Sequence, residues 1–381
     1  MRKIISIVLF ALVFFNACAQ TERRLLIPFT LNEKVGFIDQ HMKLVYPAEF
    51  SRLLELSGEF ALVQKEKKNT WGKFLIDSHG KCRQIDIFYD FGFLPNDLYY
   101  IHASQSSCSN PILNLRIPKG GTMVYHLYSD EKKLLRYVQL FTSSTIDFIN
   151  AVITDPNSPH LFRKTYVNIK GEPSFPNIYR SVCGYFNENE EATYISSEKW
   201  RGDFRILTKD GEIRENYIFD SLTSFYSGLS FGLRQKDKAL GFFDTYGELK
   251  IPLKVLPGTK DYDNYHFEDG IAPALLIDGS LYAVFYHQRY VSKNWCLINT
   301  EGKIIKSGIE AAYISPFYKG VSIVCNKNDK YALMKNDGTF ITDFILEDAN
   351  PAYYFVEGIC EGKDVLIDRK NGKMYYCENF K

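Results

Sequence analysis

Four aspartates recur at one place in a repeating pattern, and carboxylates at regular intervals are able to do chemistry. Each follows a short apolar run and precedes a polar turn; they are Asp39, Asp77, Asp244 and Asp368. Brought together, such carboxylates could bind calcium, or two of them could act as general acid and base in a glycosidase-like site. Alternatively, each carboxylate accepts hydrogen bonds from backbone N–H groups of its own turn. Their recurrence at turn starts favours this second interpretation.

Other residue types that support catalysis or metal binding lack the spacing that such sites require. The seven histidines are scattered, and the sequence contains neither H-E-x-x-H nor a cysteine–histidine spacing typical of zinc sites. It also contains no G-x-S-x-G elbow, no Walker loop and no glycine-rich dinucleotide fingerprint. We therefore predict a protein that is not an enzyme and that uses no metal or cofactor.

Aromatic side chains are the main candidates for binding. Phe, Tyr and Trp make up 15% of the chain, and their rings could stack on sugar faces, anchor a protein partner, or simply fill the layers between repeats. Two segments, 258–266 and 286–292, lie outside the repeat pattern, where binding residues tend to sit on a rigid scaffold. The candidate binding residues there are Tyr262, Tyr265, His266, Tyr286, His287, Arg289 and Tyr290.

The first 19 residues have the three parts of an export signal. Arg2 and Lys3 precede an apolar run over residues 4–15, and small residues follow at 17–19. This run is shorter than the roughly 20 apolar residues of a spanning helix, so a cleaved signal is the better interpretation. The residues before Cys18 resemble a lipobox, which would lipidate Cys18, whereas Ala17-Cys18-Ala19 also fits cleavage after Ala19. We expect an exported protein, either lipid-anchored in a bacterial cell envelope or periplasmic or secreted.

Net charge and cysteine content bear on the kinds of partner that the protein can bind and on its disulfide bonds. The formal net charge is +1, which argues against nucleic-acid binding and against a polybasic membrane-surface protein. Besides Cys18 there are seven cysteines, an odd number, so at least one stays unpaired. Cys325 and Cys360 lie inside apolar runs, and we expect these two thiols to be buried.

A repeating unit organises most of the chain. It consists of an apolar or aromatic residue, a small residue, two or three apolar residues, Asp, Asn or Lys, two polar residues and a glycine; its clearest copy is residues 240–247. The turn glycines at 171, 211, 247, 302, 338 and 372 recur at intervals of 34–40 residues, with one of 55. The pattern predicts a hairpin turn that ends in a left-handed residue, with Met42 in the glycine's place in one copy.

Two further features of the unit indicate strands. A short apolar segment follows the turn, and an aromatic-x-x-Gly signal then leads into a third strand, as at Phe225–Gly228 and Phe317–Gly320. The small-residue slot, occupied by Gly36, Gly72 and Gly241 among others, predicts that another backbone or an aromatic ring passes close by. Each unit is therefore about three short strands, too few to bury its own face, and stability must come from stacking neighbours.

The pattern resembles the WG-repeat family of bacterial proteins, whose unit carries Trp-Gly or Tyr-Gly, Ile-Asp, a turn glycine and aromatic-x-x-Gly. Only Trp71-Gly72 keeps the naming dipeptide intact. The resemblance covers residues 32–90 and 166–376 and says almost nothing about activity, because such repeats occur in proteins of mostly unassigned function.

The domain organisation follows from the repeats. We predict an export signal at 1–19, N-terminal repeats at 23–102, a degenerate repeat or insertion at 103–165, and C-terminal repeats at 166–381. Within 103–165, we predict a short helix near 144–153. Eight or nine units of roughly 40–45 residues fit an all-β fold, a seven- or eight-bladed β-propeller, with an open β-solenoid as the alternative.

These expectations favour a non-enzymatic exported repeat scaffold that binds an envelope or extracellular protein, or polysaccharide. The alternative is a glycan-binding module that uses Tyr and Trp stacking. A hydrolase with a carboxylate pair is a third and weaker possibility.

Overall fold

The computed structural model describes residues 25–57, 60–67, 70–85, 89–94, 98–103, 137–140, 149–155, 158–167, 174–175, 182–184, 186, 191–196, 203–256, 265–284, 289–352 and 354–380. These residues form β-strands, turns and one short 3-10 helix, and no α-helix occurs among them. The chain divides into two compact units, with the boundary between strands β7 and β8. The predicted all-β repeat architecture is confirmed.

The first unit contains two antiparallel sheets, each made from strands that are consecutive in sequence. One is β1 (Ile27–Leu31), β2 (Lys34–Ile38) and β3 (Leu44–Phe50); the other is β4 (Arg52–Ser57), β5 (Phe60–Lys67), β6 (Thr70–Asp77) and β7 (Cys82–Ile85). Phe380, from the end of the chain, belongs to this unit, and its ring packs edge-on against that of Phe29 with centroids 5.1 Å apart.

The second unit begins with two small antiparallel sheets. They are β8 (Tyr89–Leu94) with β9 (Leu98–Ala103), and β10 (Tyr137–Leu140) with β11 (Ile149–Asp155) and β12 (Ser158–Val167). Residues 149–153 therefore form a strand where we had predicted part of a short helix. The β-branched Ile149, Val152 and Ile153 suit a pleated strand, and this segment pairs along its length with β12. The rest of that predicted helix, 144–148, lies outside the described residues.

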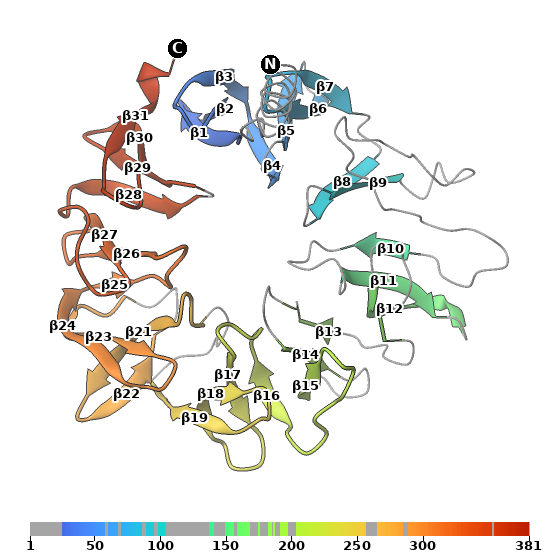
Figure 1. The fold of residues 1–381 in the computed structure, drawn as a ribbon, viewed down its shortest axis with the longest axis vertical. Coiled ribbons are helices and arrows are strands. Elements are labelled where there is room, and N and C mark those ends of the chain that lie inside the picture. Colours follow the sequence, from blue (N-terminus) through green and yellow to red (C-terminus); the bar gives the residue numbers. More distant parts are fainter. Residues whose placement is uncertain are drawn as a thin grey trace, which may run out of the picture. The chain divides into compact units, whose positions relative to one another are not determined.

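The remaining strands of the second unit form three larger sheets (Figure 1). The first is β13 (Val182–Cys183), β14 (Ala192–Ser196), β15 (Phe204–Thr208), β16 (Phe219–Leu222), β17 (Leu229–Arg234), β18 (Leu240–Asp244) and β19 (Leu249–Pro252). The second is β20 (Lys254–Val255), β22 (Ser280–Ala283), β21 (Ile271–Ile277), β23 (Ser292–Asn299) and β24 (Ile304–Ala311). The third is β25 (Tyr313–Ile314), β26 (Val321–Cys325), β27 (Tyr331–Lys335), β28 (Leu346–Pro351), β29 (Val356–Cys360), β30 (Lys363–Ile367) and β31 (Met374–Tyr376), which leads into the 3-10 helix η2 (Cys377–Asn379).

The structural units have three or four strands, where the sequence predicted about three: β1–β3 and β10–β12 form three-stranded sheets, and β4–β7 form a four-stranded one. The two seven-stranded sheets are each joined in the middle by a single residue pair, Phe204↔Phe219 and Tyr331↔Leu346. On the C-terminal side of each junction, four antiparallel strands follow one another, β16–β19 and β28–β31. The strand that the sequence pattern missed is the one before the aromatic-x-x-Gly signal, such as β16. A four-stranded antiparallel sheet is the unit from which propeller blades are built.

The carboxylates of the recurring aspartates accept hydrogen bonds from backbone N–H groups of their own turns, as the second interpretation predicted. Asp244 Oδ1 accepts hydrogen bonds from the backbone N–H groups of Tyr246 and Glu248, both at 2.9 Å. The same two-bond arrangement occurs at Asp39 and Asp77, and Asn299 supplies it in a further copy. The residue that ends the turn has a positive φ, 85° at Gly247 and 62° at Met42. Both predictions for this turn are therefore confirmed.

Each turn glycine also packs against the preceding repeat. A Cβ added to Gly247 would lie 2.5 Å from the ring of Tyr217, and one added to Gly338 would lie 2.7 Å from Lys306. Gly302 likewise faces Ile251 of β19 at 3.3 Å. The turn of one repeat thus lies against a residue that follows the turn of the repeat before it, and the closest approach is at Gly247, where the Tyr217 ring leaves no room for a Cβ.

The aromatic-x-x-Gly signal is a two-residue hairpin turn. Tyr226 and Leu229 exchange both backbone hydrogen bonds, and the two residues between them, Ser227 and Gly228, have φ values of 54° and 77°. Two positive φ values in a two-residue loop define a type I′ turn, which matches the twist of the flanking strands. The copy that we predicted at 354–358 differs, because Gly358 lies inside β29.

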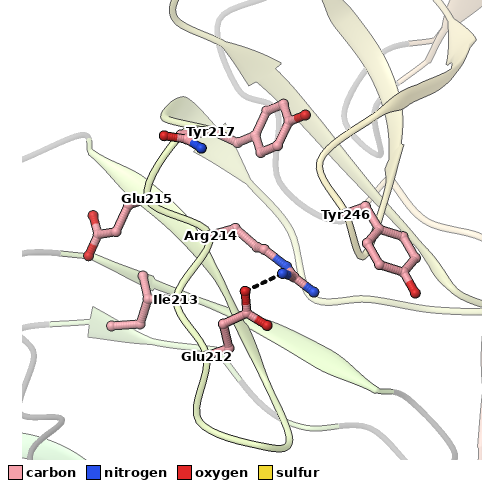
Figure 2. A pocket seen from close by; sticks show the side chains of 7 residues that line it. Glu212, Ile213, Arg214, Glu215, Tyr217 and Tyr246 are labelled. Carbon is pink, nitrogen blue, oxygen red and sulfur yellow. Dashed lines mark hydrogen bonds and ion pairs between the residues drawn. The ribbon is translucent and has the colours of Figure 1, made fainter.

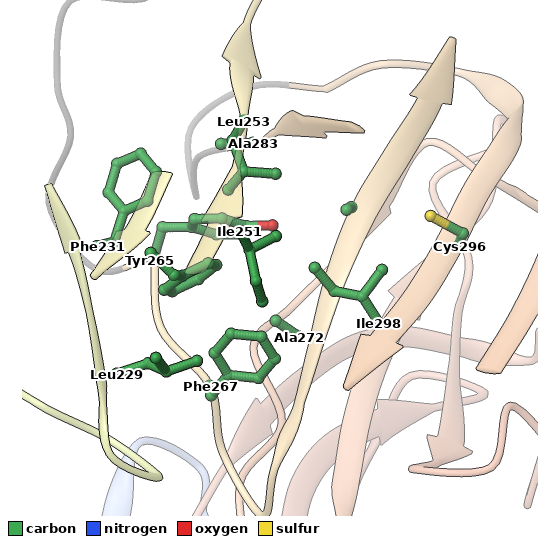
Figure 3. Packing of buried hydrophobic residues seen from close by; sticks show 12 residues of the cluster. Leu229, Phe231, Ile251, Leu253, Tyr265, Phe267, Ala272, Ala283, Cys296 and Ile298 are labelled. Atoms are coloured by element: carbon green, nitrogen blue, oxygen red, sulfur yellow. The ribbon is translucent and has the colours of Figure 1, made fainter. Parts of the chain in front are cut away.

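Aromatic rings fill the space between successive sheets of the second unit. Phe231 and Phe242 from one sheet meet Tyr265 and Phe267, which precede β21, and small residues of the next sheet (Figure 3). The Phe242 and Phe267 centroids are 4.5 Å apart. The small-residue slots accommodate close neighbours, since a Cβ on Gly241 would lie 2.1 Å from the carbonyl oxygen of Ile251. Stability therefore comes from stacking of neighbouring repeats, as predicted.

The cysteines whose side chains are described are free thiols, and most are buried. Cys325 and Cys360 are 1% and 5% exposed, which confirms the expectation for both. Burial raises the pKa of Cys296 to about 11 and that of Cys377 to about 12. These thiols pack as small apolar groups.

Candidate functional site

An open pocket of about 380 Å³ lies beside the first large sheet of the second unit (Figure 2). Its lining comes from residues 212–217, which connect β15 to β16, and from Tyr246 in the turn between β18 and β19. The lining residues are Glu212, Ile213, Arg214, Glu215, Asn216, Tyr217 and Tyr246.

The backbone of the 212–217 segment is fixed by hydrogen bonds to β15 and to its own turn. The Arg214 N–H donates to the Ile206 carbonyl at 3.0 Å, and the Glu212 N–H donates to the Thr208 hydroxyl at 3.1 Å. Ile213 forms an isolated β-bridge with Leu207 and packs against a buried apolar cluster. Figure 2 shows the Arg214 side chain directed toward Tyr246 with the Glu212 carboxylate beside it, and the Glu215 carboxylate on the other side of the segment.

Tyr246 is held out to solvent by its turn. Its backbone N–H is one of the two donors to Asp244, and its side chain is 63% exposed, the largest exposure among the big apolar and aromatic side chains that the structure describes. The Arg214 guanidinium carbon lies 5.3 Å from the centroid of the Tyr246 ring. Figure 2 shows this guanidinium between the Tyr246 ring and the Glu212 carboxylate.

The charges at the pocket are already paired within the protein. Arg214 Nη1 forms an ion pair with Glu212 Oε1. Arg205, from β15, forms a second pair with Glu215 at 2.8 Å. Two carboxylates and two guanidinium groups therefore balance. The carboxylates stay accessible, because the Glu212 and Glu215 side chains are 57% and 65% exposed.

Tyr217 forms the back of the pocket and is buttressed by the neighbouring hairpin. Its hydroxyl donates a hydrogen bond to Glu248, which raises the pKa of the Tyr217 hydroxyl. Arg234 lies 5.9 Å from the Tyr217 ring centroid and donates to the Gly247 carbonyl at 3.0 Å. Two further bonds join Arg234 to Asp237 and hold the pKa of that carboxyl at about 2.

The binding residues predicted from the sequence lie elsewhere and do not form one site among the described residues. Tyr265 is 2% exposed in the core between two sheets, where its hydroxyl donates to the Pro273 carbonyl at 2.7 Å. His266 is half-buried and stacks on Tyr226 with ring centroids 4.3 Å apart. Tyr262, Tyr286 and His287 lie outside the described residues, as does Cys18.

Arg289 and Tyr290 attach their loop to the protein. Arg289 forms an ion pair with Asp329, and its other terminal nitrogen lies 3.4 Å from the Tyr331 hydroxyl. The Tyr290 N–H donates to the Ala312 carbonyl at 2.8 Å, and the Tyr290 carbonyl accepts from the Trp295 indole at 3.1 Å. Tyr290 keeps 38% of its surface exposed.

The hairpin turns of successive sheets touch one another at a second polar cluster. The Gly270 N–H donates to the Ser227 hydroxyl at 3.2 Å. Lys319 lies 5.4 Å from the Tyr354 ring centroid, and burial lowers the pKa of its ammonium group. Arg369, 8% exposed, donates to the Tyr318 carbonyl at 3.1 Å and to two further backbone carbonyls. These contacts join neighbouring repeats.

Sequence reasoning missed the pocket because its residues lie next to the repeat template rather than inside an insertion. Tyr246 occupies an ordinary variable position of the turn, and only its neighbours show that this ring faces a gap. The stretch 212–217 could have indicated a binding site, because it holds three charged residues, an Asn and a Tyr just before a strand.

Within the ranges given above, no group of three or more His, Cys, Asp or Glu side chains is arranged to hold a metal ion. None of the helical segments in those same ranges is long and apolar enough to cross a membrane.

Known structures resemble the chain only distantly. BamB from Moraxella catarrhalis has 11% identity over 92% of this chain and 93% of that chain, with a TM-score of 0.33. A eukaryotic initiation factor has 9% identity over 93% and 96%, with a TM-score of 0.46, and the Pan2 WD40 domain of Neurospora crassa has 8% over 84% and 82%, with a TM-score of 0.28. At these values the fold assignment rests on the sheets and turns described above.

Sequence comparison is more specific for one stretch of the chain. No curated protein shows significant sequence similarity to the chain. The model of the "WG containing repeat" family matches residues 36–68, a stretch that begins within β2 and includes β3, β4 and β5. This match agrees with the resemblance to WG repeats seen in the sequence.

Proposed function

We propose that this protein is a non-enzymatic repeat scaffold, exported to the cell envelope, that binds another macromolecule. The observation that carries the proposal is the pocket around Tyr246. It presents an exposed aromatic ring beside carboxylates whose charges are already balanced by arginines. Such a surface is suited to binding, because an exposed ring and a few exposed polar groups can contact a ligand directly.

The four-stranded units support the same proposal. Their recurring polar residues are used in the turns, as Asp244 is, so the invariant parts of the repeat maintain the scaffold. The variable turn positions, such as that of Tyr246, carry the exposed side chains. Variable loops on a rigid scaffold are where proteins commonly place binding residues.

The proposal includes export and lipidation at Cys18. Both are inferred from the sequence of residues 1–19. Cys18→Ser tests the anchor. If Cys18 carries lipid, the wild-type protein incorporates labelled palmitate and partitions into detergent, and the variant does neither. Equal behaviour of the two proteins would favour cleavage after Ala19.

Affinity capture tests the binding function. The tagged full chain is incubated with a detergent extract of the source cell's envelope, in parallel with Tyr246→Ala and with Glu301→Ala as the matched control. Glu301 occupies the turn position of Tyr246 in the next repeat and is also exposed. We expect the wild type and Glu301→Ala to retain the same material and Tyr246→Ala to lose it. Equal capture by all three proteins would contradict a role for the pocket.

A further inference from the structure

We propose that the pocket around Tyr246 binds one or two residues of an uncharged carbohydrate chain. This inference rests on the proposed binding function and names the ligand class of the same site. It is carried by the charge balance of the pocket, by its exposed ring and by the kinds of hydrogen-bonding groups that line it.

The charge balance favours an uncharged ligand. Glu212 pairs with Arg214, and Glu215 pairs with Arg205. An anionic ligand such as a phosphate would have to compete with a carboxylate for a guanidinium group, and a cationic ligand would have to compete with an arginine. A neutral polar ligand can use the remaining donors and acceptors while both ion pairs stay intact.

The Tyr246 ring provides the surface on which a sugar could lie. A pyranose has one face of C–H groups, which packs well against an aromatic face and requires little desolvation. Tyr246 is 63% exposed, and its turn is held by two hydrogen bonds to Asp244, so the ring is presented without a large loss of conformational freedom on binding.

The other lining groups match hydroxyl pairs. Each sugar hydroxyl both donates and accepts, and neighbouring hydroxyls lie close enough to bind a carboxylate, guanidinium or amide group in a bidentate manner. Glu212, Arg214, Glu215 and Asn216 supply all three group types along five residues of chain. The volume of about 380 Å³ and the open mouth suit one or two sugar units of a longer chain.

A protein partner fits the same lining less well. Hot spots of protein interfaces are buried aromatic or arginine anchors in apolar, fully desolvated pockets. Here Ile213 is the one aliphatic lining residue, and it is already packed against the buried cluster of the protein. The pocket thus offers polar groups and one ring, and little further apolar area to bury.

Calorimetric titration of the purified full chain tests the inference with a panel of uncharged trisaccharides: cellotriose, maltotriose, laminaritriose, mannotriose and tri-N-acetylchitotriose. We expect at least one to bind with a Kd in the micromolar to millimolar range. Tyr246→Ala should weaken this Kd at least tenfold. Tyr246→Phe, which keeps the ring, and Glu301→Ala should each stay within threefold. No binding by any member at 10 mM, or binding that Tyr246→Ala leaves unchanged, would overturn the inference.

A second arm separates this inference from the proposed function. The envelope extract is treated with a mixture of glycosidases before the capture experiment. If carbohydrate is the ligand, capture falls after treatment and the Tyr246→Ala difference disappears. If capture depends on Tyr246 but survives glycosidase treatment and is lost after protease, the partner is a protein: the carbohydrate inference is then wrong while the proposed function stands.

Discussion

At the scale of single residues, the polar groups of the repeat are used to build turns. Asp244 is typical: its Oδ1 accepts from two backbone N–H groups, and its Oδ2 pairs with Lys250 at 2.9 Å. A short polar side chain at a turn start replaces the backbone carbonyl that a tighter turn would use. This explains why carboxylates recur in the sequence without forming an acid pair.

Substitution of Asp244 tests this role. Asp244→Ala removes the Oδ1 that accepts both hydrogen bonds, and we expect a loss of about 1–2 kcal/mol in the free energy of unfolding, by analogy with the loss of a helix N-cap. Asp244→Asn should cost clearly less, since Asn299 performs the same task in the next repeat. Urea denaturation followed by fluorescence measures both. An Asn variant as unstable as the Ala variant would show that the ion pair with Lys250 dominates.

Glu357 gives a second prediction, on pH dependence. It lies in β29, and burial, followed by repulsion from Asp364, raises the pKa of its carboxyl above the ordinary 4.5. A pKa raised in the folded state means that folding favours the protonated form. The contribution of this carboxyl group to the free energy of unfolding is therefore fully present below pH 4.5. It is lost as the pH rises through the folded-state pKa.

Glu357→Gln should accordingly stabilise the protein at pH 7 and have little effect at pH 4. Thermal melts at both pH values measure the difference in Tm between variant and wild type. Glu310→Gln is the control, because Glu310 is exposed on β24. A variant that is equally or less stable than wild type at pH 7 would contradict the assigned direction.

At the scale of elements, the sequence predicted the turns better than the number of strands. A turn is determined by neighbouring residues, an aspartate that accepts hydrogen bonds and a glycine that adopts a positive φ, so its pattern is visible locally. The strand β16 was missed because its side chains alternate only weakly between buried and exposed positions and its pairing partner lies beyond a turn. The pocket was missed for a related reason, since Tyr246 and Arg214 belong to different hairpins.

Substitution of two glycines distinguishes the free-energy cost of an unfavourable backbone conformation from the cost of close approach by a neighbouring atom. Gly241 and Gly270 both have positive φ, 152° and 75°. A Cβ on Gly241 would lie 2.1 Å from the Ile251 carbonyl oxygen, whereas one on Gly270 would meet nothing within 4 Å. Gly270→Ala should therefore cost about 1–2 kcal/mol, the penalty of the left-handed region.

Gly241→Ala should cost clearly more, about 3 kcal/mol or above, because the β18–β19 pairing must also move. Chemical denaturation of the two variants gives both values. Similar losses at the two sites would mean that β19 shifts easily, which would contradict the view that the small-residue slot fixes the spacing between these strands.

At the scale of the whole molecule, the repeats stabilise one another rather than themselves. Phe242 of β18 and Phe267, which precedes β21, share one core, and the described turn glycines Gly247, Gly302 and Gly338 each face the repeat before their own. In any open array of such units, two terminal sheets would each keep an apolar face without a neighbour, whereas a closed ring leaves none. The closed propeller and the open solenoid are therefore distinct predictions about the arrangement of the repeats.

Small-angle X-ray scattering of the mature chain distinguishes the two arrangements. A compact closed fold of roughly 360 residues should have a radius of gyration of about 21 Å. The ring should also show one broad peak in its distance distribution that falls to zero near its diameter, because a compact particle has no widely separated ends. An open solenoid of the same repeats would give a larger radius and a distribution with a long tail. A long tail in a monodisperse sample would therefore show that the repeats continue in line instead of closing, and the propeller prediction would be wrong.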